Sequence, residues 1–266
     1  MEQKLSVVLI VRNEEAIIRS CFESVKWANE IVIIDQSSTD RTGEIAREYT
    51  DKIFVTPAQG TANHNRMFGI SKATFDWILF LDADELVPPD LKEEIQTVLR
   101  APKEHTSFYI GRKNFFLGKW IKGGAWYPAY SIKLFRKGSA YFPPKVHRDA
   151  QLKEGQKQGY FKAKTLHYTY NSLSQYLAKL DRFTTRSAGE AFKEGYRITW
   201  FNFIFCFFIR PAFYFFRKYF IWCGFRDGFR GLFIAFSSSL ALLIHYSKIW
   251  ELQNNIQDRR QYTKPS

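Results

Sequence analysis

The sequence predicts an α/β fold in which helices flank a mainly parallel sheet. Short, uninterrupted apolar runs alternate with stretches of helical periodicity through the first hundred residues. Two of these runs end directly on an aspartate, Asp35 and Asp82. Unbroken apolar runs are typical of strands buried on both faces, and their alternation with helices implies βαβ units with right-handed crossovers.

The individual elements follow from this periodicity. We expect buried strands at residues 5–11, 31–34, 53–55 and 77–81. Helical spacing predicts helices at residues 14–27, 63–73 and 90–99, and another helix that ends near residue 49.

The middle of the chain, residues 106–169, is denser in aromatic residues, glycine and lysine, with less regular strands at 108–110 and 132–135. Between these strands, K-W-I-K-G-G-A-W-Y-P-A-Y predicts a flexible loop with Gly123 and Gly124 as its hinge. Its aromatic side chains, Trp126 among them, fit either a wall on which a sugar stacks or an ordinary packed core.

The composition bounds the partners and the compartment. A formal net charge of +13 over 266 residues indicates an anionic partner, which is a nucleic acid, a phosphate-bearing substrate or an anionic membrane. The three cysteines lie far apart, without the spacing of a zinc site or a disulfide framework, as in a reducing compartment. The N-terminus runs straight into a strand pattern and lacks the apolar core of a signal peptide, so we expect a cytosolic location.

The stretch from Trp77 to Glu85, W-I-L-F-L-D-A-D-E, holds the clearest candidate site. Asp82 and Asp84 follow a buried strand at the edge where open α/β sheets bind ligands. Carboxylates with this spacing suit Mg²⁺ or Mn²⁺ holding a phosphate-bearing substrate. Acids after a strand also solvate loops or cap helices, but Asp90 already supplies the cap of the next helix.

Asp35 repeats this placement at the end of an earlier strand. Its carboxylate fits either hydrogen bonds from a ribose or a base, or an Asx turn into the polar residues that follow. The chain has no G-x-G-x-x-G pattern and no P-loop, which disfavours both dinucleotide binding and P-loop phosphate binding.

The last third of the chain is helical and rich in phenylalanine. An amphipathic helix is expected over residues 172–191, followed by W-F-N-F-I-F-C-F-F-I and A-F-Y-F-F-R-K-Y-F-I-W-C-G-F. Interleaved cations and aromatic residues favour helices lying in a membrane interface, with Lys and Arg reaching the headgroups. The alternative is a helical hairpin that buries its phenylalanines against the rest of the protein or a second subunit. We expect Gly228 and Gly231 to bracket the turn of this hairpin.

Three motifs in order carry a family resemblance. S-V-V-L-I-V-R-N-E-E, I-V-I-I-D-Q-S-S-T-D-R-T and W-I-L-F-L-D-A-D-E resemble the family 2 inverting glycosyltransferases, which have a GT-A fold. S-I-K-L-F-R-K, K-V-H-R-D and Y-F-I-W-C-G-F-R-D-G-F-R-G-L are similar to lipopolysaccharide-core glucosyltransferases of bacteria that act on a heptose.

This resemblance implies roles at the matching positions. The residues implied in nucleotide binding are Arg12, Asn13, Glu14, Asp35, Arg66, Asp82 and Ala83. Asp84 is the expected metal ligand. His147 would either complete the metal's ligands or bind the leaving diphosphate, and His167 is its rival. Relatives carry Glu where Arg148 stands, so Asp149 is the expected general base, because an inverting transferase needs a carboxylate to take the acceptor's proton. Trp126 and Lys133 are the expected acceptor-binding residues.

The sequence therefore predicts a hexosyltransferase that uses Mg²⁺ or Mn²⁺ and a UDP-sugar at its DXD motif. The expected acceptor is a lipid-linked or lipopolysaccharide-core saccharide at the cytoplasmic face of the bacterial inner membrane. Residues 1–170 would form the catalytic domain, with 1–100 binding the nucleotide and 101–170 the acceptor, and residues 171–266 would associate with an anionic membrane surface. No nucleic-acid partner is expected, and a homo-oligomer stays open. A nucleotidyltransferase and a non-catalytic protein that binds anionic ligands or membranes are the alternatives.

Overall fold

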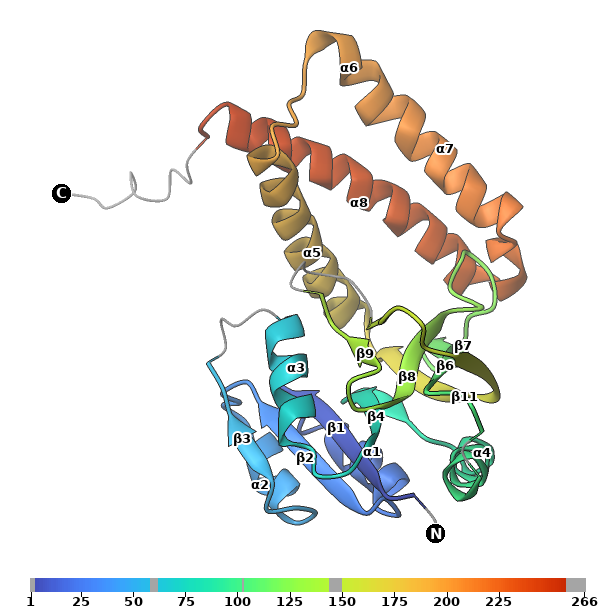
Figure 1. Cartoon of the computed structure of the whole chain (residues 1–266). Coiled ribbons are helices and arrows are strands. Elements are labelled where there is room, and N and C mark those ends of the chain that lie inside the picture. The colour runs from blue at the N-terminus through green and yellow to red at the C-terminus, as the bar shows by residue number, and fades with distance from the viewer. Residues whose placement is uncertain (1–2, 58–61, 102, 144–149, 257–266) are drawn as a thin grey trace, which may run out of the picture. The chain divides into compact units, whose positions relative to one another are not determined.

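The computed structural model describes residues 3–57, 62–101, 103–143 and 150–256. The chain forms two compact units (Figure 1). The sheet unit comprises Met1–Asn114 and Pro128–Thr169, and the helical unit comprises Phe115–Tyr127 and Tyr170–Ser266. The loop segment Phe115–Tyr127 thus groups with the C-terminal helices.

The predicted α/β fold is confirmed. Four parallel strands stand in the order β3-β2-β1-β4, and their bounds are β1 Leu5–Val11, β2 Glu30–Asp35, β3 Ile53–Val55 and β4 Trp77–Asp82. The sheet continues with β8 Tyr130–Arg136, β6 Ser107–Phe116, β11 Gln158–Tyr170 and β5 Glu85–Leu86, where the pairs β4–β8, β8–β6 and β11–β5 are antiparallel. Short strands complete the set, namely β7 Lys119–Trp120 beside β6, and β9 Ala140–Tyr141 paired with β10 Gln151–Leu152.

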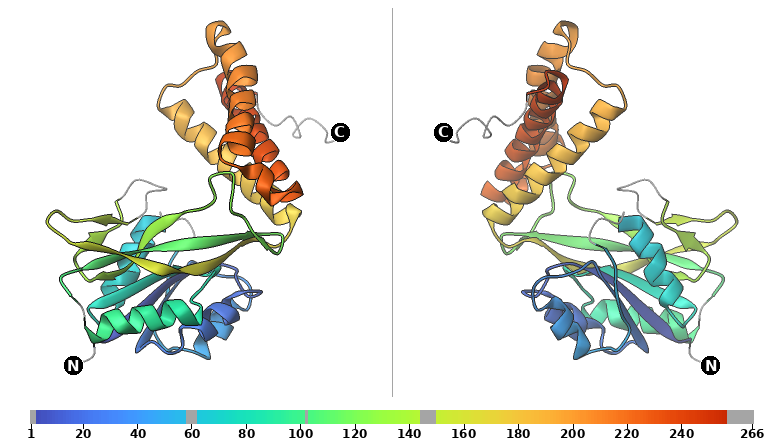
Figure 2. Two further views of the ribbon diagram at one scale, coloured as in Figure 1. Left: turned by 90° about the vertical axis from the view of Figure 1, so that its right-hand side faces the viewer. Right: turned by 90° about the vertical axis from the view of Figure 1, so that its left-hand side faces the viewer.

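Helices cover both faces of the parallel strands (Figure 2). They are α1 Ile18–Val25, α2 Thr42–Arg47, α3 Ala62–Lys72 and α4 Pro89–Arg100. Successive strand residues point to opposite faces, so alternate side chains of β1 enter different cores. Val7 belongs to the core formed with α1, α2 and α4, whereas Val8 belongs to the core formed with α3. Helix α1 begins later than predicted, because the chain first makes a turn in which Glu14 O accepts from Ile17 N and Ile18 N.

The strand register brings the acids to one edge. Val11 is paired with Asp35 on one side of β1, and Ile10 is paired with Asp82 on its other side. Both aspartates therefore end neighbours of the same central strand, which is the ligand-binding edge of an open α/β sheet.

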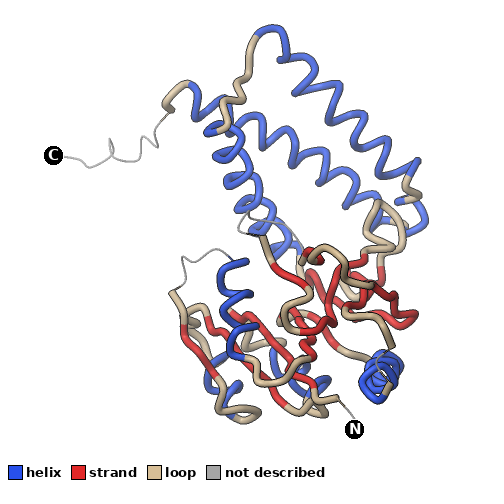
Figure 3. Tube along the Cα trace, viewed as in Figure 1, coloured by secondary structure: helices blue, strands red, loops and turns tan. Residues whose placement is uncertain are grey.

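The described part of the helical unit is built from long helical stretches (Figure 3). Its helices are α5 Leu173–Lys193 and α8 Phe229–Gln253, with α6 Trp200–Ile204, η1 Phe205–Ile209, α7 Arg210–Phe216 and η2 Arg217–Ile221 running end to end between them. The segments η1 and η2 are π-helical, and η1 directly precedes Arg210-Pro211, where the proline nitrogen has no hydrogen to donate. Among the described residues, α8 is the one helix long and apolar enough to cross a membrane, and 28% of its most apolar window is buried.

The loop at Gly123 and Gly124 is an anchored turn rather than the predicted hinge. The buried carboxylate of Asp227 accepts from Lys122 N at 3.1 Å and from Gly123 N at 2.7 Å. A Cβ on Gly123 would lie 2.3 Å from the carbonyl oxygen of Cys223, so only glycine permits this approach. The loop is consequently fixed to the turn that precedes α8.

Two further expectations for the helical unit are corrected. Gly231 lies inside α8 rather than in the turn, where a Cβ would come within 1.8 Å of Gly224 O. Lys218 does not reach outward to headgroups, because it is buried and its Nζ donates to Gly124 O at 3.2 Å. Burial, reinforced by neighbouring Arg217, lowers the pKa of Lys218 to about 8.

Candidate active site

Hydrogen bonds connect the loop after β1 to the loop after β2 at the carboxyl edge of the parallel strands. Asn13 adopts a left-handed backbone conformation, with φ of 55°, and its Oδ1 accepts from Thr39 N at 2.8 Å. Its own N–H donates to Ser38 Oγ at 3.0 Å. Ser38 in turn donates to Asp35 Oδ1 from both its backbone N, at 2.9 Å, and its hydroxyl, at 2.6 Å.

Asp35 therefore accepts hydrogen bonds within the turn that follows it, close to one of its two expected roles, and still lies at the edge. Ser38 bonds to Oδ1, and Oδ2 faces the space above Gly43, where an added Cβ would lie 3.4 Å away. Arg12 is exposed on the same loop as Asn13, and the backbone N of Glu14 donates to Thr42 Oγ1 at 2.8 Å. Nucleotide binding by these residues stays a prediction, but the hydrogen bonds hold their loops in one arrangement.

Asp82 lies among three cations. Its carboxylate is 3.2 Å from Lys133 Nζ, 3.7 Å from Arg66 Nη2 and 4.0 Å from Arg112 Nη1. Burial alone would raise the pKa of Asp82. The cations outweigh burial, Lys133 most of all, and hold the pKa of this carboxyl below its ordinary value, so Asp82 is ionised at neutral pH.

Lys133 and Glu85 are the most deeply buried pair of this cluster. Lys133 Nζ donates to Glu85 Oε2 at 2.5 Å, and both side chains are almost fully excluded from solvent. Glu85 also lies 3.6 Å from Arg112 Nη1 and accepts from Asp82 N at 3.3 Å. The predicted acceptor contact of Lys133 stays a prediction, and in this structure its ammonium orients Asp82.

A small cavity of about 60 Å³ opens beside the cluster. Arg66, Arg112, Lys133 and Asp82 line it together with Phe80 and Phe142. The guanidinium of Arg66 lies 5.4 Å from the Phe80 ring centroid, and Arg66 Nη1 donates to Asn63 Oδ1 at 3.0 Å. Three cations against one lining carboxylate make the cavity attractive to an anionic group.

Asp84 faces a histidine instead of these cations. Asp84 Oδ2 lies 3.1 Å from His167 Nε2, and His167 Nδ1 lies 2.7 Å from Asn114 Oδ1. An imidazole whose Nδ1–H donates to Asn114 presents the lone pair of Nε2 to Asp84, and two acceptors at this distance need a proton or a cation between them. The pairing of β11 with β5 fixes the placement, since His167 stands opposite Glu85 in the ladder.

This pair fits a divalent ion. Two neighbouring ligands in an octahedral shell at about 2.1 Å from Mg²⁺ lie about 3.0 Å apart, close to the 3.1 Å between these donors. Imidazole and carboxylate are both suitable donors for Mn²⁺. Among the described residues, no three His, Cys, Asp or Glu side chains are placed to hold one metal ion together, so the remaining ligands would come from substrate phosphates and water.

Several predicted residues lie elsewhere. His147 and Asp149 lie outside the described residues. Ala83 is buried between the two aspartates. Trp126 packs in the helical unit against Phe116, with ring centroids 5.9 Å apart, which is the packed-core alternative for this residue.

Two residues of the site, Arg112 and Asn114, were not predicted from the sequence. Arg112 and Asn114 stand on β6, inside a stretch of mixed polarity that matches none of the motifs. A pattern search finds Asp84 because acids follow an apolar run, but it cannot find partners that a distant strand supplies.

Acids at the carboxyl ends of parallel strands, beside an anion-attracting cavity, define an α/β enzyme for a charged substrate. The family model Glycosyl transferase family 2 matches residues 6–151. The chain belongs to this family and is a glycosyltransferase with the GT-A fold.

Individual relatives are distant in sequence. The lipopolysaccharide core biosynthesis glycosyltransferase LpsC of Rhizobium meliloti (strain 1021) is 26% identical over 254 residues, covering 93% of this chain and 92% of LpsC. An uncharacterized glycosyltransferase of Rickettsia felis is 26% identical over 260 residues, covering 94% of this chain and 90% of that protein. The crystal structure of S. aureus TarS 1-349 aligns with a TM-score of 0.45 and 16% identity, covering 97% of this chain and 93% of that one.

Proposed function

We propose that this glycosyltransferase moves a sugar from a UDP-sugar, with inversion, onto a lipopolysaccharide-core or other lipid-linked saccharide, and that it requires Mg²⁺ or Mn²⁺. One observation carries the metal dependence. Asp84 Oδ2 and His167 Nε2 face each other at 3.1 Å, at the strand edge where the donor would lie.

In this proposal three sets of residues at the strand edge have separate roles. Asn13, Glu14 and Asp35 bind the nucleoside from loops that hydrogen bonds hold together. Arg66 and its neighbouring cations face the diphosphate, where positive charge offsets that of the leaving group. Asp84 and His167 hold the metal, which when bound supplies further charge neutralisation for the departing diphosphate.

Proton transfer is assigned to a carboxylate outside the described residues. Asp149 is the proposed general base, which takes the acceptor hydroxyl's proton as its oxygen attacks the anomeric carbon. Asp149→Asn should then abolish transfer while leaving UDP and Mn²⁺ affinity unchanged, as measured by calorimetry.

The acceptor proposal has two supports. LpsC, similar over nearly the whole of both chains, is by its name an enzyme of lipopolysaccharide core biosynthesis. The helical unit exposes large apolar side chains along one helical stretch, including Phe201 at 96% and Trp200 at 87% of their full accessibility. Such a surface fits a membrane interface, where a lipid-linked acceptor would be found.

Asp84→Asn tests the proposed metal site. The variant should lower sugar transfer by roughly 100-fold or more and weaken Mn²⁺-dependent UDP binding, because one of the two protein ligands loses its charge. Asp90→Asn, on the exposed first turn of α4, is the matched control and should change neither. Transfer that survives both Asp84→Asn and chelation would show that the metal proposal is wrong.

A further inference from the structure

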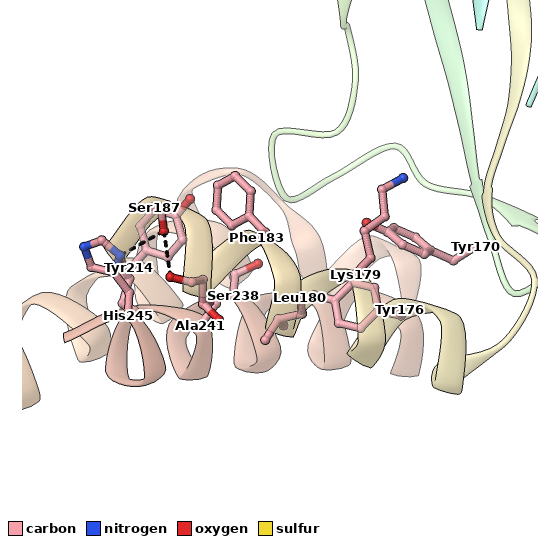
Figure 4. Close-up of a pocket in the computed structure, with 12 residues that line it drawn as sticks. Tyr170, Tyr176, Lys179, Leu180, Phe183, Ser187, Tyr214, Ser238, Ala241 and His245 are labelled. Carbon is pink, nitrogen blue, oxygen red and sulfur yellow. Dashed lines mark hydrogen bonds between the residues drawn. The ribbon is translucent and has the colours of Figure 1, made fainter. Parts of the chain in front are cut away.

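A solvent-open pocket of about 440 Å³ lies on the helical unit, where α5, α8 and Tyr214 of α7 meet, and Phe183 at its wall is exposed (Figure 4). Most of its wall is carbon. The larger contributors are aromatic and aliphatic side chains, namely Tyr170, Tyr176, Leu180, Phe183, Tyr214 and Leu242. A pocket of this size and character is typical of small-molecule sites, in which a few polar groups fix an otherwise apolar ligand.

Several polar groups at the wall, namely Ser187, His245 and the Tyr176 hydroxyl, already have partners within the protein. Ser187 Oγ lies 2.9 Å from His245 Nδ1 and also 3.2 Å from Thr184 O (Figure 4). The Tyr176 hydroxyl lies 2.7 Å from Ser237 Oγ. These bonds are already made within the protein, so the pocket offers few hydrogen bonds to a sugar and presents mainly an apolar surface.

One cation stands at one end of the pocket. Lys179 and Tyr170 lie at the end opposite Ser187 and His245 (Figure 4). Lys179 is solvent-exposed, its ammonium is 5.0 Å from the Tyr170 ring centroid, and within the described part of the chain it makes no hydrogen bond or ion pair. The described residues that line the pocket include neither Asp nor Glu. Charge complementarity therefore favours an anion at this end.

The length of the pocket completes the argument. Lys179 and Ser187 are eight residues apart on α5, which is about 12 Å along a helix. We propose that this pocket binds the hydrocarbon chain of an anionic amphiphile, with the chain along Leu180 and Phe183 and a carboxylate or phosphate beside Lys179. The proposal rests on the pocket alone and does not depend on the donor site.

Photo-crosslinking of the detergent-solubilised full chain tests the proposal without any variant. The probes are palmitate, phosphatidylglycerol and phosphatidylcholine, each with a diazirine on the acyl chain. Labels should map by mass spectrometry to pocket residues such as Phe183 and Ala241, and excess unlabelled palmitate should compete. Labels confined to the outer face of α8, at Phe229 and Phe236, or no labelling at all, would overturn the pocket assignment.

The same probes separate the two anionic sources and test the charge. Labelling by palmitate alone identifies a free fatty acid as the ligand, and labelling by phosphatidylglycerol identifies a membrane lipid; either result supports the site. Equal labelling by phosphatidylcholine would overturn the anionic headgroup. Lys179→Ala should remove the preference for anionic probes, whereas Lys193→Ala, at the exposed end of α5, should keep it.

Two matched tryptophan substitutions test the pocket, one that fills it and one that leaves it open. Ala241→Trp should reduce pocket labelling at least tenfold, whereas Ser247→Trp, on the exposed side of the same helix, should leave it unchanged. Helicity and thermal unfolding, both followed by circular dichroism, serve as folding controls. Since labelling is scored without sugar transfer, a failure here is distinct from a failure of the proposed reaction.

Discussion

Asp82 and Asp84 are separated by a single residue, but they have different partners. The strand's alternation sends Asp82 toward Lys133, Arg66 and Arg112, and the chain's turn after β4 sends Asp84 toward His167. Asp82 is thus paired with cations, and Asp84 is the acid that faces the proposed metal site. The same D-x-D pattern contains two different chemical environments.

Asn114 should tune the proposed metal site through His167. Asn114→Leu removes the nearer of two partners of His167 Nδ1 and leaves Thr169 Oγ1 at 3.2 Å, so we expect Mn²⁺ affinity to fall by roughly 10-fold. Saturating Mn²⁺ should restore most of kcat. Asn171→Leu, at an exposed position, is the control, and an unchanged Mn²⁺ titration of the Asn114 variant would argue against metal binding by His167.

Glu30 gives the sheet unit an acid-dependent stability. Burial alone would raise the pKa of its carboxyl. Hydrogen bonds from Lys52, Ser6 and Thr74 outweigh burial and lower the pKa from 4.5 to about 2. Because the folded-state pKa is depressed, the stabilisation is complete above pH 4.5 and is lost as the pH falls through about 2.

Glu30→Gln should therefore lower the free energy of unfolding at pH 7 by about 2 kcal/mol. The difference from the unsubstituted protein should shrink as the pH falls below 4.5. Urea unfolding followed at pH 7 and pH 3 measures it. Glu154→Gln, on an exposed turn, should have little effect, and parallel pH profiles for the Glu30 variant and the unsubstituted protein would contradict the assignment.

At the scale of elements, glycines in the helices have opposite roles. Gly189 lies near the C-terminal end of α5 with nothing within 4 Å of an added Cβ, whereas Gly231 lets α8 approach Gly224 closely. Sequence alone treats both as helix-weakening residues. The packing decides which of them the fold requires.

Alanine should consequently have opposite effects at the two positions. Gly189→Ala should stabilise the helical unit by about 0.5–1 kcal/mol, because alanine loses less backbone entropy in a helix. Gly231→Ala should destabilise it by about 1–3 kcal/mol through overpacking against Gly224 O. Thermal unfolding of the detergent-solubilised chain, followed by circular dichroism, measures both; equal shifts would contradict this account of the turn before α8.

At the scale of the whole molecule, the question is what covers the apolar surface of the helical unit. Some cations of this unit are engaged within the protein. Arg210 donates to the Tyr246 hydroxyl at 2.5 Å, and Lys218 is buried. The exposed side chains between residues 200 and 221 are consequently mostly aromatic and aliphatic. A surface of this kind favours contact with a membrane or another protein.

Removal of exposed aromatic side chains tests the membrane proposal. Phe205→Ser with Phe213→Ser should reduce flotation with anionic liposomes more than tenfold, because the two rings together lose about 2 kcal/mol of burial in the bilayer. Val55→Ser with Tyr160→Ser, exposed on the sheet unit, is the control. Unchanged flotation, with a loss of self-association in sedimentation, would identify the surface as a contact between copies instead.

Much of the sheet unit could be predicted from the sequence. The strands at residues 5–11, 53–55 and 77–81 are found within a residue of their predicted bounds, because a strand buried on both faces requires an unbroken apolar run. The loop at Gly123 was predicted less well. Its anchor, Asp227, lies about a hundred residues away, and no local pattern reports a contact over that separation.

The sequence by itself determined the family, the parallel strands and the acids that end them, since these depend on local periodicity and on motifs of fixed spacing. Only the tertiary structure decided that Asp82 lies among cations and Asp84 beside His167. It also decided that Lys133 is buried with Glu85 and that Gly231 belongs inside a helix. These facts depend on which distant strand or helix supplies the neighbour, and the free energy of a buried charge or a close backbone approach is set by that neighbour.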